Sequence, residues 1–203
     1  IPAWLLENHD LVMVGYRGVD GSSRLDCPEV FKALKGTGSN LLGDTSLDAI
    51  GAAMQACSTR LIAEGVDLNG YTITEVVRDM EAARASLGYE KINLISESYG
   101  TRVAQIYAAM YPDSILRSAM IGVNPPGHFV WNPDVVDSQI TQYADLWKQQ
   151  VGSAAPDLVK AMQKVNAEMP NHWLFAPIDP GKVKMVAFMM LFHRTTSPMV
   201  FDA

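Results

Sequence analysis

The chain has 203 residues, of which 48% are hydrophobic and 19% are charged, and its formal net charge at pH 7 is −6. These proportions are typical of a globular protein with one sizeable domain, or one domain with an appendage, and they exclude a disordered or fibrous chain. The acidic balance argues against nucleic acid as a partner, because a phosphate backbone must be neutralised by basic side chains.

The apolar runs are too short for a membrane span, which needs about 20 residues. The longest run, residues 185–192, predicts a buried helix instead. The chain opens at Ile1 without a basic segment or an initiator methionine, so no signal peptide is predicted. Such an opening is typical of the interior of a longer protein.

The first predicted element is a strand over residues 10–15, because a short continuous apolar run is typical of a fully buried strand. A turn-rich loop, residues 16–23, follows at the carboxyl end of this strand, where open α/β sheets place their active sites. We expect Arg17 to brace this loop through hydrogen bonds. The glycine-rich loop at residues 36–43 lacks the Gly-Lys-Ser/Thr ending of a phosphate-binding loop, so nucleotide binding is not predicted.

Two helices are predicted before the next strand. The first covers about residues 45–64. The second begins at Thr72, which is expected to form a capping box with Glu75, and it ends at Gly88, a residue suited to a helix C-cap. Its apolar residues recur at helical spacing, and they are Ile73, Val76, Val77, Met80, Ala83 and Leu87.

The next stretch predicts a strand, a tight turn and a helix, with Ser98 at the apex of the turn. In such a nucleophile elbow the serine sits on a strained turn, so that its Oγ stands clear of strand and helix. The residues two before and two after it must be small, and they are Ser96, where the usual pattern has glycine, and Gly100. The backbone N–H of Tyr99 is expected to donate to a developing oxyanion. The alternative is an ordinary strand-to-helix loop that carries a serine.

A helix over about residues 101–110 and a strand over residues 116–123 follow. The resulting order of strands and helices predicts a right-handed parallel α/β sheet. Residues 124–127, Asn-Pro-Pro-Gly, then interrupt the pattern. Only helices are predicted beyond them, and these open at Asn132-Pro133, Pro156 and Asp179-Pro180.

These features together resemble the α/β-hydrolase fold and, more narrowly, the tripeptidyl aminopeptidase and proline iminopeptidase group of serine exopeptidases. The resemblance covers about residues 9–123. It rests on the Arg17-Gly18 loop with Ser22 and Ser23, on Cys27, Cys57, Tyr71 to Thr74 and Asp79, and on Leu87 to Tyr89 and Glu97 to Thr101. The group commonly has Asp-Gln-Arg-Gly where this chain has Gly-Tyr-Arg-Gly at residues 15–18.

The resemblance implies a partial α/β-hydrolase core with a parallel, doubly wound sheet in residues 1–123 and part of a helical lid in residues 124–203. It also implies missing parts of the same fold. These are earlier strands with a second oxyanion donor, and two later strands with the acid and the histidine of the triad. We therefore expect a fragment that is inert by itself, because a serine without a base is a poor nucleophile. No triad position falls on any histidine present, namely His9, His128, His172 or His193.

The function implied for the intact protein is that of a serine hydrolase acting by acyl transfer, an exopeptidase that releases residues from peptide N-termini. Ser98 would be the nucleophile and the N–H of Tyr99 an oxyanion donor. Glu168 and Asp179 in the lid are available to hold the free amine of a substrate, or they are simply solvated. A carboxylesterase acting on a small ester is one alternative, and a non-catalytic binding protein is another. No cofactor is implied.

Cys27 and Cys57 are the only cysteines. A disulfide closing the loop between them would stabilise the protein by about 3–4 kcal/mol on the chain-entropy model. The resemblance implies this pairing and a secreted or periplasmic protein. The alternative is a pair of buried free thiols in a cytoplasmic protein. Neither cysteine belongs to a Cys-x-x-Cys or Cys/His pattern, so no metal site is predicted.

Overall fold

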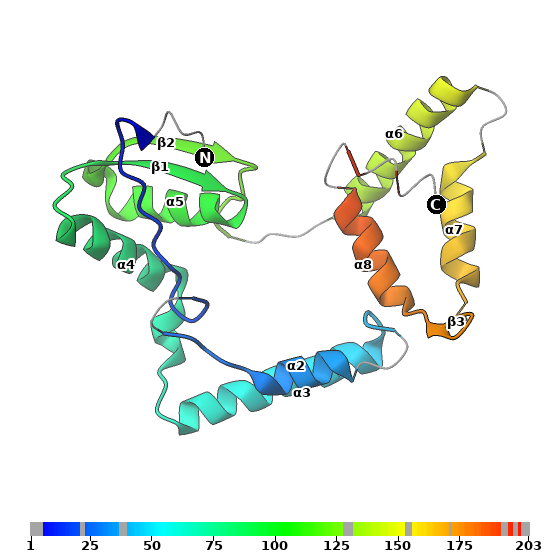
Figure 1. Ribbon diagram of the computed structural model, residues 1–203, viewed down its shortest axis with the longest axis horizontal. Coiled ribbons are helices and arrows are strands. Elements are labelled where there is room, and N and C mark those ends of the chain that lie inside the picture. Colours follow the sequence, from blue (N-terminus) through cyan, green and yellow to red (C-terminus); the bar gives the residue numbers. More distant parts are fainter. Residues whose placement is uncertain are drawn as a thin grey trace. The chain divides into compact units, whose positions relative to one another are not determined.

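The computed structural model of the chain is shown in Figure 1. It describes residues 6–20, 23–36, 40–127, 132–152, 156–170, 172–191, 195–196 and 199. The chain divides into two compact units, one formed by Ile1–Asp26 with Ser58–Phe129 and the other by Cys27–Cys57 with Val130–Ala203. Within the described part of the chain, no helix has the length and apolar character needed to cross a bilayer.

The first unit is built on a parallel pair of strands, β1 (Ile92–Glu97) and β2 (Ile115–Ile121). Helix α5 (Tyr99–Met110) makes the crossover between them, and helix α4 (Ile73–Ser86) precedes β1 (Figure 1). The unit also contains two short 3-10 helices, η1 (Leu68–Tyr71) and η2 (Pro112–Ser114), and the end of helix α3 (Asp44–Ala63). This order confirms the parallel α/β arrangement predicted from the sequence.

The core of this unit lies between the two helices and one face of the strands. Its buried members are Val76, Val77, Val103 and Tyr107. Ile92 and Leu94 of β1 pack against them, while Ile95 on the opposite face of the strand is 61% exposed. Among the described residues, therefore, α4 and α5 cover one face of β1.

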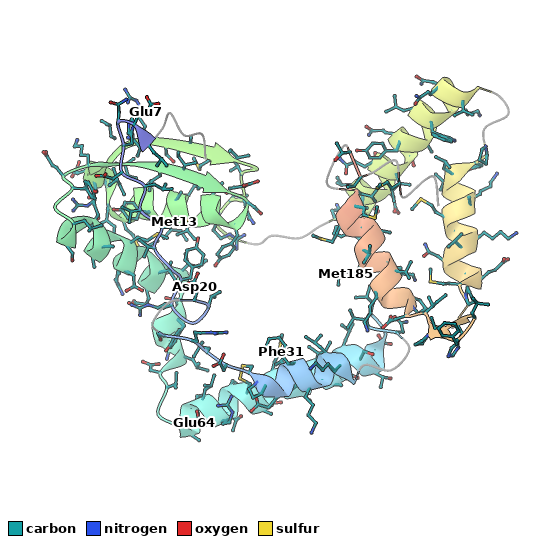
Figure 2. The ribbon with its side chains drawn as sticks, viewed as in Figure 1. Glu7, Met13, Asp20, Phe31, Glu64 and Met185 are labelled. Carbon is teal, nitrogen blue, oxygen red and sulfur yellow. A yellow bond between two sulfur atoms is a disulfide. The ribbon has the colours of Figure 1, made fainter. Side chains whose placement is uncertain are left out.

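The strand predicted over residues 10–15 is absent, and the prediction is wrong. Leu11, Val12 and Met13 lie in irregular chain and are 44%, 48% and 85% exposed, and Met13 is labelled in Figure 2. An apolar run becomes a strand only when a neighbouring strand takes up its backbone hydrogen bonds. Among the described residues, the parallel ladder joins only β1 and β2, so this run has no partner strand.

Helix α4 forms as predicted, but its capping box does not. Thr72 occupies the N-cap position in an extended conformation, and its side chain caps no backbone N–H. Its hydroxyl instead lies 2.8 Å from that of Thr74, and the Glu75 carboxylate is taken by Arg78. Gly88 follows the helix at a φ of 79°, a conformation that suits glycine.

The second unit contains α2 (Pro28–Lys35) and part of α3 (Asp44–Ala63), together with α6 (Pro133–Val151), α7 (Leu158–Glu168) and α8 (Pro180–Met190). Helix α2 was not among the predicted elements. Helices α6 and α8 begin where the sequence predicts, and α7 begins two residues after the predicted Pro156. In each helix the N-cap side chain, that of Asn132, Asp157 or Asp179, accepts a backbone N–H of the first turn. A small hairpin of β3 (His172–Trp173) and β4 (Ala176–Pro177) interrupts the stretch predicted to be helical only.

Two further expectations concern this second unit. Cys27 and Cys57 form a disulfide with their Cα atoms 5.4 Å apart, which confirms the predicted pairing. The apolar helix forms as α8, but Val186 and Met189 are 58% and 55% exposed rather than buried. The expectation of a buried helix is wrong for these side chains, because no described element covers them.

The start of α8 is joined to the loop between α2 and α3. Asp179 accepts the N–H of Leu41 at 2.9 Å and that of Lys182 at 3.1 Å. Gly181 approaches the same loop so closely that a Cβ atom there would lie 2.5 Å from the backbone nitrogen of Leu42. Only glycine fits at this position without a shift of the backbone.

Candidate active site

Ser98 lies between the last residue of β1 and the first residue of α5, as the sequence predicts. Its φ of 50° and ψ of −121° are unusual for a residue with a Cβ atom. Such strained residues persist where the surrounding structure holds them, and they concentrate at functional sites. The Ser98 side chain is exposed, and its N–H donates to the Ile121 carbonyl at 2.9 Å, which ties the turn to the end of β2.

The two small residues that flank Ser98 face each other. A Cβ atom built on Gly100 would lie 3.7 Å from the Cβ of Ser96 and 3.9 Å from the hydroxyl of Tyr16. These are ordinary contact distances, so serine at position 96 is accommodated in place of the usual glycine. A long side chain at either position would push strand and helix apart.

Arg17 braces the loop after residue 16, which confirms the expectation for this residue. Its guanidinium donates two parallel hydrogen bonds to Asp79 on α4, at 2.6 and 2.5 Å, and a third to the Gly70 carbonyl at 2.6 Å. Such a fork is the strongest form of a charged pair. The hydrogen bonds from Arg17 hold the pKa of Asp79 below its usual value.

The braced loop brings an aromatic side chain to the turn. The Tyr16 ring lies 6.3 Å from the Tyr99 ring, centroid to centroid, with the planes tilted by 60°. Burial raises the pKa of the Tyr16 hydroxyl, and Tyr99 and Asp20 raise it further. The phenol therefore remains neutral at physiological pH. Tyr16 stands where the resembling group commonly has glutamine.

Sequence reasoning missed one polar residue of this site. Thr101 is fully buried in the first turn of α5, and its hydroxyl donates to the Ser98 carbonyl at 2.7 Å. The Thr101 hydroxyl oxygen also accepts the N–H of Asn124 at 2.8 Å. A threonine in the first turn after an N-cap serine is the sequence signal that points to such a bond.

Within the described part of the chain, no histidine or carboxylate forms a hydrogen bond with the Ser98 Oγ. His9 lies in irregular chain and His172 in β3, whereas His128 and His193 fall outside the described residues. The described residues also contain no cluster of three His, Cys, Asp or Glu side chains suited to a metal ion.

The two carboxylates considered for the amine of a substrate, those of Glu168 and Asp179, have other surroundings. Asp179 is engaged as the cap of α8. Burial raises its pKa, but the N–H groups of Leu41, Lys182 and Gly181 outweigh burial and hold the pKa below its usual value. Glu168 is 68% exposed, with the Lys164 ammonium 4.0 Å away. Its solvated position is the ordinary one for a surface carboxylate.

A parallel strand–turn–helix–strand unit with an exposed serine at a positive φ is the arrangement of an α/β hydrolase. The family model for the alpha/beta hydrolase fold matches residues 2–160, and the chain belongs to this family.

Its relatives are named as serine peptidases or aminopeptidases. The tripeptidyl aminopeptidase of Streptomyces lividans is 27% identical over 174 residues, which is 82% of this chain and 32% of that protein. The tripeptidyl aminopeptidase of Streptomyces coelicolor is also 27% identical over 174 residues, and the match covers 31% of that protein. Serine protease Hip1 of Mycobacterium bovis is 28% identical over 125 residues, 62% of this chain and 20% of that protein.

The chain thus spans about a third of the length of the tripeptidyl aminopeptidases that it matches. No solved structure matches the chain.

Proposed function

We propose that the intact protein is a serine exopeptidase that releases residues from peptide N-termini by acyl transfer, with Ser98 as its nucleophile. The observation that carries this proposal is the Ser98 turn, which presents an exposed hydroxyl at a φ of 50° between β1 and α5. Holding a residue in this conformation costs about 1–3 kcal/mol of stability, and residues strained in this way cluster at functional sites. The strain therefore supports a functional role for Ser98. The names of the relatives support a peptidase.

The Ser98 oxygen would attack the carbonyl carbon of the scissile bond and form a tetrahedral intermediate. As the first residue of α5, Tyr99 has no carbonyl acceptor for its N–H within the helix. That N–H would donate to the oxyanion, where the positive end of the helix dipole also lies. A histidine from a part of the intact protein outside this chain would take the Ser98 proton and give it to the leaving amine, and an acid from the same part would orient that histidine. Water would then hydrolyse the acyl-enzyme and release the N-terminal fragment.

The remaining parts of the proposal rest on separate observations. The Cys27–Cys57 disulfide supports export to an oxidising compartment, because disulfides persist there and are rare in the cytoplasm. Residues 124–203 are proposed as part of the lid over the site, beginning at the Asn-Pro-Pro-Gly break.

The test uses the intact protein and a serine-reactive fluorophosphonate, with the adduct read by intact mass. One adduct is expected on the natural protein and on Ser114→Ala, a matched serine variant of the same unit, and none on Ser98→Ala. A folded intact protein without an adduct would refute the nucleophile.

The substrates that the intact protein cleaves then distinguish an exopeptidase from a carboxylesterase. Cleavage of a tripeptide anilide with a free amine, but not of its N-acetylated form, is expected of an exopeptidase. Turnover of small esters alone would instead assign the protein as a carboxylesterase.

A further inference from the structure

Thr101 is the most completely buried polar side chain near the candidate nucleophile. It has no exposed surface. Its hydroxyl uses its one proton toward the Ser98 carbonyl, at 2.7 Å, and a lone pair toward the Asn124 N–H, at 2.8 Å. The Ser98 carbonyl also accepts the Thr101 N–H at 3.0 Å. One side chain thus joins the strained turn to the chain that follows β2.

Other bonds fasten the same two segments. Arg102 donates to the Asn124 side-chain oxygen at 3.0 Å and to the Pro125 carbonyl at 3.1 Å. Gln105 donates to the Asn124 carbonyl at 3.2 Å. Residues 124–125 are therefore held by three side chains of α5, those of Thr101, Arg102 and Gln105. The Ser98 N–H is held by the Ile121 carbonyl.

We propose that Thr101 is a positioning residue for Ser98. The Thr101 hydroxyl locks the strained turn to Asn124 and so fixes the direction of the Ser98 Oγ. This inference rests on the proposed function. A positive φ on a residue with a side chain persists only where its surroundings over-determine it. Among the contacts of Thr101, the bond to the Ser98 carbonyl acts directly on the residue that carries the strain. Because a small misplacement of a reacting atom lowers the rate steeply, the hydroxyl matters for reaction and not only for folding.

The test compares three variants of the intact protein. Thr101→Val keeps the volume and removes both hydrogen bonds, whereas Thr101→Ser keeps the hydroxyl. Tyr107→Phe is the matched control, since it removes a buried hydroxyl from the same helix, one that bonds to Glu81 and not to the turn. Where Thr101→Val does not fold, Thr101→Ala carries the same prediction.

The readouts are the rate constant for fluorophosphonate labelling of Ser98, corrected for the folded fraction, and kcat and KM on a peptide substrate. In Thr101→Val the labelling rate and kcat should fall about 10- to 100-fold while KM stays unchanged. Thr101→Ser should restore most of the rate, and Tyr107→Phe should react like the natural protein. Equal rates in Thr101→Val and the natural protein, or equal losses in Thr101→Val and Tyr107→Phe, would overturn the positioning role.

A measurement that does not depend on the reactivity of Ser98 separates this inference from the proposed function. Amide hydrogen exchange at Asn124 should be about tenfold faster in Thr101→Val than in the natural protein, because the N–H loses its acceptor. Unchanged exchange would overturn the lock even if Ser98 reacts. Failure of the natural protein to label at all would instead refute the serine hydrolase, and with it the positioning role.

Discussion

Glu81 lies where α4, α5 and η2 meet, and it links α5, the helix that follows Ser98, to its neighbours. Its carboxylate accepts hydrogen bonds from Arg84 at 2.7 and 2.9 Å, from the Tyr107 hydroxyl at 2.5 Å and from Ser114 at 3.4 Å. The bonds from Arg84, followed by the bond from Tyr107, lower the pKa of Glu81 from 4.5 to about 2. Burial raises the pKa of the Tyr107 hydroxyl to about 12, with Glu81 adding to the effect.

The shift predicts an acid-dependent loss of stability. Because the pKa of Glu81 is lower in the folded state than in the unfolded state, its stabilisation is complete above about pH 4.5 and disappears as the pH falls toward 2. A shift of this size corresponds to roughly 3 kcal/mol, and partial solvent exposure of the carboxylate, 19%, reduces this to about 2 kcal/mol. Glu81→Gln should lose a similar amount at neutral pH and show little of this acid dependence.

Amide hydrogen exchange in β1 and α5 of the intact protein measures the relevant opening free energy between pH 7 and pH 2.5. The difference between the natural protein and Glu81→Gln isolates this one carboxylate from the others. The control is Glu64→Gln, which removes a 54%-exposed partner of Arg60 and should leave the pH profile unchanged. Parallel profiles for the natural protein and Glu81→Gln would refute the reasoning.

Three further predictions concern single contacts. Arg17→Lys replaces the fork on Asp79 by a single point charge, so hydrogen exchange in the loop over residues 18–25 should accelerate about tenfold, and an unchanged rate would contradict the brace. Gly181→Ala should lower the free energy of unfolding by about 1–3 kcal/mol because its Cβ would lie 2.5 Å from a backbone nitrogen, whereas Gly51→Ala, with nothing within 4 Å, should stabilise α3 by about 0.5–1 kcal/mol in the same denaturation assay. Cys57→Ser should cost about 3–4 kcal/mol in urea unfolding, and a loss well below this would mean that the unfolded chain is already compact there.

The elements that the sequence predicts correctly depend on local signals. β1, the turn at Ser98 and α5 follow from an apolar run, small residues and a helical pattern that lie within a few residues of one another. Helices α6 and α8 begin at Asn-Pro and Asp-Pro pairs, where a side chain caps the helix and proline tolerates the first position. Such signals are complete within a short segment, so the rest of the fold does not change their outcome.

The failed predictions share a different cause. The apolar run over residues 10–15 has the composition of a strand, but the pairing of a strand is decided by a neighbour that its own residues do not specify. Glu75 has the position for a capping box, but Arg78 and Arg17 compete for its carboxylate. The first pattern lacked the partner strand that it needs, and in the second a competing side chain took the carboxylate of the capping box.

The sequence by itself therefore determined the class of fold and the location of the candidate nucleophile, because each depends on a local motif. The pairing of the two cysteines was only implied by the family resemblance, and the structure decided it. The tertiary structure decided how the turn is held. Arg17 meets Asp79 across 62 residues, and Thr101 meets Asn124 across 23. Such bonds depend on how α4, α5 and the end of β2 pack, and the spacing of residues along the chain does not predict that packing.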